Sequence, residues 1–135
     1  MNVLVLNCGS STLKFQIIET DLGKIDRDAD VRLARGVVER IGSLSVITLQ
    51  AAGKAPVVDS APVRDHRAAI DRVLRWAVSP QSGIGAVRSL GDVHAVGHRV
   101  VHGGERFQLS VRIDDEVVHG ITDCIELAPL HNPAN

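Results

Sequence analysis

A short apolar run near the N-terminus places the tightest limit on the fold. Residues 2–7, "NVLVLN", form a continuous run of this kind, which is typical of a strand covered on both faces. After the polar stretch "CGSST", the apolar residues Phe15 and Ile17 alternate with the polar residues Lys14 and Gln16. The sequence therefore predicts a second strand that pairs back on the first as a hairpin.

Changes in hydrophobic periodicity predict the other elements. Four more strand-like segments lie at 31–38, 44–50, 56–61 and 93–101. Apolar residues recur at helical spacing over 64–78 and 114–128, whereas the polar and charged segment 20–30 is expected to be a loop. The second helix is expected to end at Pro129 and to place these residues on one face: Val117, Val118, Ile121, Cys124, Ile125 and Ala128. The pattern predicts an α/β domain with a mixed, mostly antiparallel sheet and flanking helices.

Composition excludes several classes of protein. A chain of 135 residues fits one domain and can bury about 70% of its unfolded surface. Its 44% hydrophobic and 23% charged residues and its net charge of −1 are typical of soluble globular proteins. No apolar run reaches the roughly 18 residues that span a bilayer. With 2% aromatic residues and two cysteines, we expect a reduced, cytoplasmic protein with no membrane or nucleic-acid partner.

The hairpin loop has the chemistry of a phosphate site, although a plain turn would have a similar composition. Gly9 allows close approach of backbone N–H groups to a ligand, and the next three residues carry hydroxyl groups. Lys14 adds a positive charge, and Asn7 ends the first strand. The spacing matches neither G-x-x-x-x-G-K-[ST] nor G-x-G-x-x-G. From the residues alone, phosphate binding and an ordinary hairpin connection both remain open.

Three segments in order resemble the signatures of a known family. "VLVLNCGSSTLKFQI" at 3–17, "AVGHRVVHGGERF" at 95–107 and "ELAPLHNPAN" at 126–135 are similar to segments of acetate kinases. The resemblance covers essentially this whole chain but only about the first third of an acetate kinase. It implies a ribonuclease-H-like fold of the actin-like ATPase superfamily, with residues 1–135 as the N-terminal domain and a second domain beyond them.

The resemblance also implies roles for the loop residues. Asn7 would help to place Mg²⁺, Ser10 and Thr12 would face the phosphates of ATP, and Lys14 would support ATP binding. In the family the residue at the position of Cys8 is usually small, such as alanine, so we expect this thiol to be a small buried apolar group rather than a catalytic one.

Further roles fall in the second and third matching segments. Arg99 matches the arginine that binds the substrate, and its guanidinium suits a carboxylate or an acyl phosphate. His131 matches a histidine beside the transferring phosphoryl group. Val101 and Leu130 match positions of the acyl pocket, although an ordinary place in the core is the alternative for both.

The histidines outside these roles are assigned to structure. His98 and His102 are four residues apart, but no third ligand at metal spacing follows them, so zinc is not expected. We expect His66, His94 and His119 to be surface or helix residues.

The reaction that the resemblance implies converts acetate and ATP into acetyl phosphate and ADP, reversibly. The remaining catalytic groups of the family lie beyond the matched part, so the chain alone is expected to be incomplete for catalysis. The resemblance also implies that full-length members are homodimers. Two alternatives stay open. One is a kinase that acts on propionate or butyrate, and the other is a non-catalytic module that binds phosphate or a nucleotide.

Overall fold

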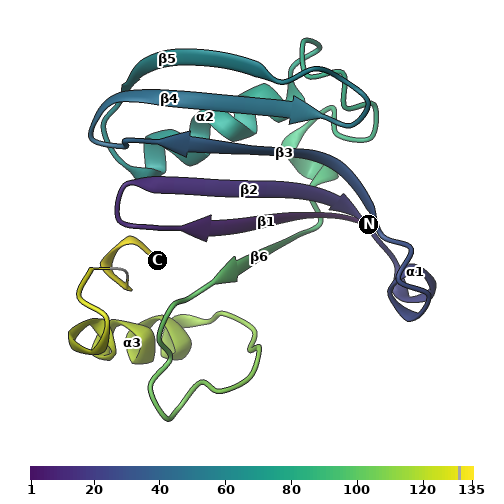
Figure 1. The fold of residues 1–135 in the computed structure, drawn as a ribbon. Coiled ribbons are helices and arrows are strands. Elements are labelled where there is room, and N and C mark those ends of the chain that lie inside the picture. Colours follow the sequence, from purple (N-terminus) through teal and green to yellow (C-terminus); the bar gives the residue numbers. More distant parts are fainter. Residues whose placement is uncertain (131) are drawn as a thin grey trace.

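The fold is built on a six-stranded mixed sheet. The computed structural model describes residues 1–130 and 132–135, and its strand order is β5-β4-β3-β2-β1-β6 (Figure 1). The first five strands pair as successive antiparallel neighbours, whereas β6 pairs with β1 in parallel. The strands are β1 (Asn2–Cys8), β2 (Thr12–Glu19), β3 (Val31–Glu39), β4 (Ser43–Ala51), β5 (Val57–Val63) and β6 (Ala95–Arg99). The predicted α/β class and mostly antiparallel sheet are confirmed.

Within residues 1–130 and 132–135, three α-helices accompany the sheet. They are α1 (Leu22–Asp26), α2 (His66–Val78) and α3 (Asp115–Asp123), and short 3₁₀ turns lie at Leu90–Asp92, between α2 and β6, and at Ile125–Leu127 and Asn132–Ala134, after α3. Figure 1 shows α2 across one face of the sheet, while α3 lies below β6 near the C-terminus. Within the described residues, no helix combines the length and the apolar character needed to cross a membrane.

The core lies between α2 and one face of the sheet. On β2, the buried side chains of Leu13, Phe15 and Ile17 alternate with the exposed side chains of Lys14 and Gln16. Because successive side chains of a strand point to opposite faces, the buried set faces α2 and the other set lies on the opposite face. We call that opposite side the open face. The apolar residues that α2 contributes to the core are Ala69, Val73 and Ala77.

The first turn of α2 is fixed by its cap. Asp65 has extended backbone angles, and its side chain accepts a hydrogen bond of 2.7 Å from the Ala68 N–H. A capping carboxylate pairs with one of the otherwise unsatisfied N–H groups at the start of a helix and typically contributes about 1 kcal/mol. The cap therefore determines where the first helical residue, His66, lies.

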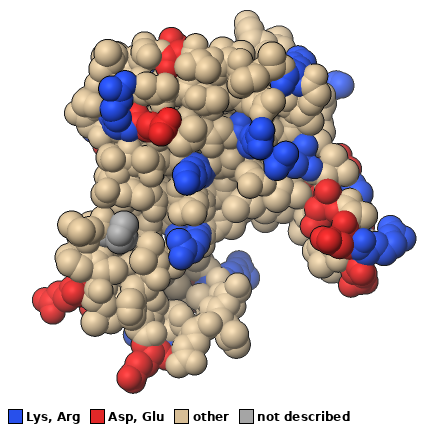
Figure 2. All heavy atoms as spheres, viewed as in Figure 1, with Lys and Arg blue, Asp and Glu red and all other residues tan. Residues whose placement is uncertain are grey.

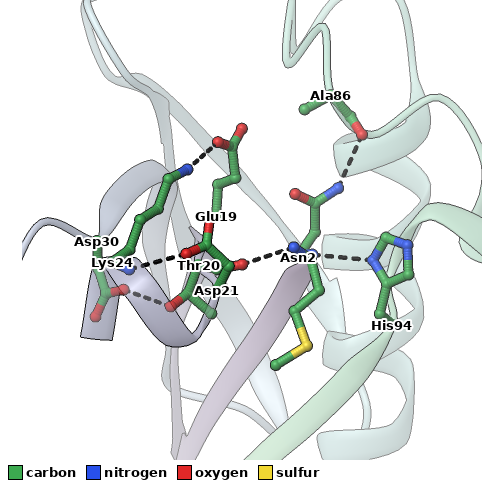
Figure 3. Close-up of polar contacts among 9 residues, drawn as sticks. Asn2, Glu19, Thr20, Asp21, Lys24, Asp30, Ala86 and His94 are labelled. Carbon is green, nitrogen blue, oxygen red and sulfur yellow. Dashed lines mark hydrogen bonds and ion pairs between the residues drawn. The ribbon is translucent and has the colours of Figure 1, made fainter. Parts of the chain in front are cut away.

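A buried asparagine fixes the register between β1 and β6. The Asn2 side chain is 6% exposed and donates to the carbonyl oxygens of Ala86 (2.9 Å) and Asp92 (3.0 Å). The Asn2 N–H donates to His94 Nδ1 at 2.9 Å, and the His94 N–H donates to the Asn2 carbonyl oxygen at 2.9 Å (Figure 3). These bonds lie at the start of both strands and fix the register of β6 on β1, which pairs Asn7 with Arg99 at the far end. His94 is exposed, as expected of a surface residue, and is also a structural partner of β1.

The segment 20–30 is not wholly a loop as predicted, because it contains α1. Asp21 caps this helix by accepting from the Lys24 N–H at 2.8 Å. Figure 3 shows the Lys24 ammonium directed at the Glu19 carboxylate and the Thr20 hydroxyl directed at Asp30. The hydrogen bond from Lys24 lowers the pKa of Glu19. Local side-chain pairing therefore stabilises a helix that hydrophobic periodicity does not reveal.

The last predicted helix is shorter than expected. α3 ends at Asp123, and a 3₁₀ turn follows instead of the predicted continuation to residue 128. The Cys124 carbonyl oxygen accepts from Asn132 Nδ2 at 3.1 Å, a side-chain bond just past the helix end. Val118, expected on the apolar face, is 52% exposed, while Val117, Gly120 and Cys124 are buried. β6 also ends earlier than expected, at Arg99 instead of residue 101.

Candidate functional site

Three of the predicted site residues form one row across the sheet. Asn7 is the direct cross-strand partner of Lys14 on β2 and of Arg99 on β6. Paired residues of neighbouring strands project from the same face. Leu6 and Cys8 are buried toward α2, so this row lies on the open face. The backbones of Lys14 and Arg99 are two strand spacings apart, about 10 Å, and their long side chains can therefore reach one anion above Asn7.

The loop between β1 and β2 is a closed turn beside this row. The Gly9 N–H donates to the Thr12 carbonyl oxygen at 2.8 Å, and the Ile41 N–H donates to the Ser11 carbonyl oxygen at 2.9 Å. A Cβ atom at Gly9 would lie 2.6 Å from Thr12 Oγ1, so glycine leaves the room that this hydroxyl occupies. Ser10 is exposed at the turn. Thr12 is two residues from Lys14 on β2 and therefore shares its face.

The open face is basic around this row. Figure 2, which views the molecule from the side opposite α2, shows basic side chains near the middle of the face, while most acidic side chains lie toward the rim. Among the described residues, neither Lys14 nor Arg99 forms an ion pair. Both cations are thus available to an anionic ligand, because no carboxylate of the described part of the chain forms an ion pair with them.

Two hollows adjoin the row. One has a volume of about 620 Å³, and its lining includes Asn7 and Lys14 together with Arg35 and Glu39. The other, about 790 Å³, lies between β6, the segment 107–113 and α3. Arg99 lines this second hollow, whose other walls are mostly apolar, with Phe107, Val111, Ile113 and Ile121 among them. Val5 lines both hollows, so they are adjacent. Asn7 and Lys14 line the first hollow, and Arg99 lines the second.

The proposed acyl-pocket residues lie outside both hollows. Val101 is 37% exposed and Leu130 is 74% exposed, and neither lines either space. Neither side chain is therefore buried in the core that the described residues form. His131 lies outside the described residues. Cys8 is 4% exposed, and burial raises the pKa of its thiol, which confirms the expected small buried residue.

The segment 132–135 connects the end of β1 with the chain that follows β6. Asn135 Nδ2 donates to the Cys8 carbonyl oxygen at 2.9 Å, and the Val101 N–H donates to Asn135 Oδ1 at 2.9 Å. Asn132 makes the corresponding pair of bonds with the backbone of His102 (3.2 and 2.9 Å). The end of β1 and the chain after β6 are thus fixed to the same segment. Sequence reasoning missed both asparagines, and the only signal for them is their place in "HNPAN".

The structure shows the surroundings of three further histidines, which the sequence did not indicate. His66 and His102 make hydrogen-bond contacts, and His98 has buried ring nitrogens. His66 Nε2 lies 2.7 Å from the Gly9 carbonyl oxygen, which connects the start of α2 with the hairpin loop. Both ring nitrogens of His98 are buried without a hydrogen-bond partner among the described residues. His102 Nδ1 accepts from the Gly104 N–H at 2.9 Å and so acts within its own turn.

The residues present provide little for a tightly held metal ion. In the described part of the chain, no group of three or more histidine, cysteine, aspartate or glutamate residues comes together. Asn7 offers one amide oxygen on the open face. Mg²⁺ prefers oxygen ligands and usually keeps several waters and the phosphates of its substrate. Asn7 therefore fits as one protein contact of a hydrated Mg²⁺ ion that a phosphate ligand carries.

Comparisons with known proteins agree with one another. A family model described as "Acetokinase family" matches residues 2–135. An acetate kinase of Solibacter usitatus is 63% identical over 135 residues, which is all of this chain and 33% of that protein. The crystal structure of Porphyromonas gingivalis acetate kinase matches with a TM-score of 0.87 and 39% identity, covering 99% of this chain and 32% of that chain.

A propionate kinase is also similar. The crystal structure of this enzyme from Francisella tularensis matches with a TM-score of 0.78 and 32% identity, covering 98% of this chain and 31% of that chain. These structural matches confirm the expected actin-like ATPase fold class. The chain spans about one third of the length of the curated relatives it matches.

Proposed function

The chain belongs to the acetokinase family, and from this premise we propose that it takes part in the reversible phosphorylation of acetate by ATP. The observation that carries the proposal is the row of Asn7, Lys14 and Arg99 on the open face, beside the turn at 9–12. Asn7 supplies an amide, and Lys14 and Arg99 supply two positive charges. The proposed ligands, which are ATP, ADP, acetate and acetyl phosphate, are all anions.

The proposed chemistry needs charge neutralisation more than proton transfer. An aliphatic carboxylate such as acetate has a pKa in the range of a glutamate side chain or slightly above it, well below 7, so it is ionised at pH 7 and attacks without a strong general base. A bond forms between its oxygen and the γ-phosphorus of ATP, the bond from that phosphorus to the bridging oxygen breaks, and ADP leaves with the electron pair. Two anions must meet in line, so the protein must hold them and spread their charge.

Each residue of the row then has a role. The Arg99 guanidinium would bind the carboxylate or the acetyl phosphate through two parallel hydrogen bonds. Lys14 and the hydroxyl groups of Ser10 and Thr12 would bind the phosphates of ATP or ADP. His131 would donate a hydrogen bond to the transferring group.

Other family expectations complete the proposal. Val101 and Leu130 would line the acyl pocket once it is complete. Bound Mg²⁺ would neutralise phosphate charge, and Asn7 would orient that hydrated ion. We also propose that the enzyme works in the cytoplasm as a homodimer.

The isolated 135-residue chain is expected to bind ligands without turnover. It spans about one third of its curated relatives, and we propose that a second domain supplies the other catalytic groups. The purified chain, given MgATP and acetate, should form no acetyl phosphate above the enzyme-free rate in a hydroxamate assay. Steady formation of acetyl phosphate by the chain alone would contradict this prediction.

Two alternatives remain to be distinguished. The similarity to a propionate kinase favours a longer acyl substrate as one of them, and an additional methylene changes selectivity by only about 1 to 3 kcal/mol. The other is a phosphate- or nucleotide-binding module without catalysis. Turnover by a full-length enzyme carrying these residues, compared for acetate and propionate, separates both alternatives from acetate kinase.

Lys14 provides a direct test of nucleotide binding. Lys14→Met keeps the apolar stem and removes the charge, and we expect the affinity for MgATP to fall by about 10- to 150-fold because one charge-assisted hydrogen bond, about 1.5 to 3 kcal/mol, is lost. Isothermal titration calorimetry measures this. Lys54→Met is the matched control, since Lys54 is an exposed residue whose Nζ donates to the Ser82 carbonyl oxygen at 3.3 Å. Equal affinities of the two variants, or no binding by the wild-type chain, would contradict the proposed function.

A further inference from the structure

Two carbonyl groups of the hairpin loop are held by side chains from distant parts of the chain. The Cys8 carbonyl oxygen accepts from Asn135 Nδ2 at 2.9 Å, and the Gly9 carbonyl oxygen lies 2.7 Å from His66 Nε2. These partners are 127 and 57 residues away in the sequence. Both contacts are partly shielded from water. These two contacts fix the orientation of the peptide groups that follow Cys8 and Gly9.

The chemistry of the contact defines the state of the His66 ring. A carbonyl oxygen only accepts, so Nε2 must carry a proton and donate. The neutral tautomer protonated at Nε2 and the cationic imidazolium both satisfy this requirement. The contact therefore needs no particular charge on His66, only the Nε2–H group.

The contact also sets the direction of the next N–H group. The structure contains no cis peptide bond among its described residues, and in a trans peptide the C=O and N–H bonds point in opposite directions. The Gly9 carbonyl points to His66, at the start of the helix that covers the other face of the sheet. The Ser10 N–H of the same peptide must then point away from α2.

The Gly9 N–H and the Ser10 N–H differ in whether they have a hydrogen-bond partner within the loop. The Gly9 N–H is used within the turn, where it donates to the Thr12 carbonyl oxygen at 2.8 Å. Within the described part of the chain, no backbone hydrogen bond involves the Ser10 N–H. An oriented and unused backbone N–H beside a lysine is the type of donor that binds phosphate oxygens.

We propose that His66 is a positioning residue of the phosphate loop. By holding the Gly9 carbonyl oxygen it directs the Ser10 N–H toward a phosphate oxygen above the open face. The Asp65 cap fixes His66 at the first position of α2, so the helix and the loop form one unit. The inference rests on the proposed function, because it assigns this N–H group to the same phosphate ligand.

Two substitutions separate the hydrogen bond from the bulk of the ring. His66→Ala removes the donor, whereas His66→Gln keeps an amide N–H at nearly the reach of Nε2. His119→Ala is the matched control, since His119 is an exposed residue of α3. Calorimetry measures the affinity of each variant for MgATP. ¹⁵N relaxation measures the backbone order parameter of the Ser10 N–H.

The expected pattern is specific to positioning. His66→Ala should weaken MgATP binding by about 5- to 30-fold and lower the Ser10 order parameter from about 0.85 to below about 0.6. His66→Gln should restore most of both values, and His119→Ala should match the wild type. Unchanged affinity and order in His66→Ala would overturn the inference, as would His66→Gln behaving like His66→Ala.

The two measurements also distinguish this inference from the proposed function. If the wild-type chain gives no heat with MgATP, the proposed function is contradicted, and the order parameter alone decides the role of His66. A fall in His66→Ala that His66→Gln reverses then supports the positioning role, and an unchanged value overturns it.

Discussion

Arg99→Ala is expected to weaken the binding of acetyl phosphate by at least about 100-fold. The guanidinium would make two parallel hydrogen bonds to the anion, each worth about 1.5 to 3 kcal/mol when charged, and a tenfold change in affinity corresponds to about 1.4 kcal/mol. Among the described residues no carboxylate pairs with Arg99, so the substitution breaks no ion pair there. Isothermal titration calorimetry of the purified chain with acetyl phosphate measures the loss.

Two further variants make this result specific. Arg99→Lys keeps the charge without the planar fork, and we expect it to recover only part of the affinity. Arg67→Ala removes one positive charge from the exposed side of α2 and should bind acetyl phosphate like the wild type. If Arg67→Ala and Arg99→Ala lose affinity equally, net charge explains the binding and the substrate role of Arg99 is wrong.

Phe15→Ala is expected to destabilise the fold by about 3 to 5 kcal/mol, a large part of the stability of a domain of this size. The Phe15 side chain is 2% exposed, and its ring meets Trp76 of α2 edge to face with centroids 6.1 Å apart. It also fills the space above Gly36, where a Cβ atom would lie 2.5 Å from the ring. The substitution therefore leaves a cavity between the sheet and the helix that carries His66.

Urea unfolding followed by far-ultraviolet circular dichroism measures this loss. Trp76, the single tryptophan, adds a fluorescence signal from the same contact. Phe15→Leu keeps most of the buried volume and should cost less than about 1.5 kcal/mol. A loss below about 1 kcal/mol for Phe15→Ala would show that the ring does not join α2 to the sheet.

Local patterns were enough to predict much of the fold. The alternation of apolar and polar residues predicted the first hairpin, and the helical period over 64–78 predicted α2 nearly to its ends. Pattern reasoning failed where short-range polar contacts decide the structure. The Asp21 cap and the Lys24–Glu19 pair stabilise α1 in a segment that has no apolar period. α3 stops early, and the Asn132 side chain bonds to the carbonyl oxygen next to its end.

The sequence by itself determined the residue types of the candidate site and the family. Asn7, the hydroxyl residues of the turn, Lys14 and Arg99 are all within segments that resemble acetate kinases, and matching a motif needs only the order of residues along the chain. It also predicted the first strand from its continuous apolar run, but the expected cover on both faces is wrong, since the residues of β1 that face α2 are buried and those on the open face are only half-buried.

Only the tertiary structure decided which of these residues meet. Arg99 lies beside Asn7 because the bonds of Asn2 and His94, 92 residues apart, fix the register of β6 on β1. The contacts of His66 and Asn135 with the loop likewise join residues far apart in the chain. A side chain's hydrogen-bond partner across such distances depends on how helices and strands pack, and hydrophobic periodicity carries no information about that packing.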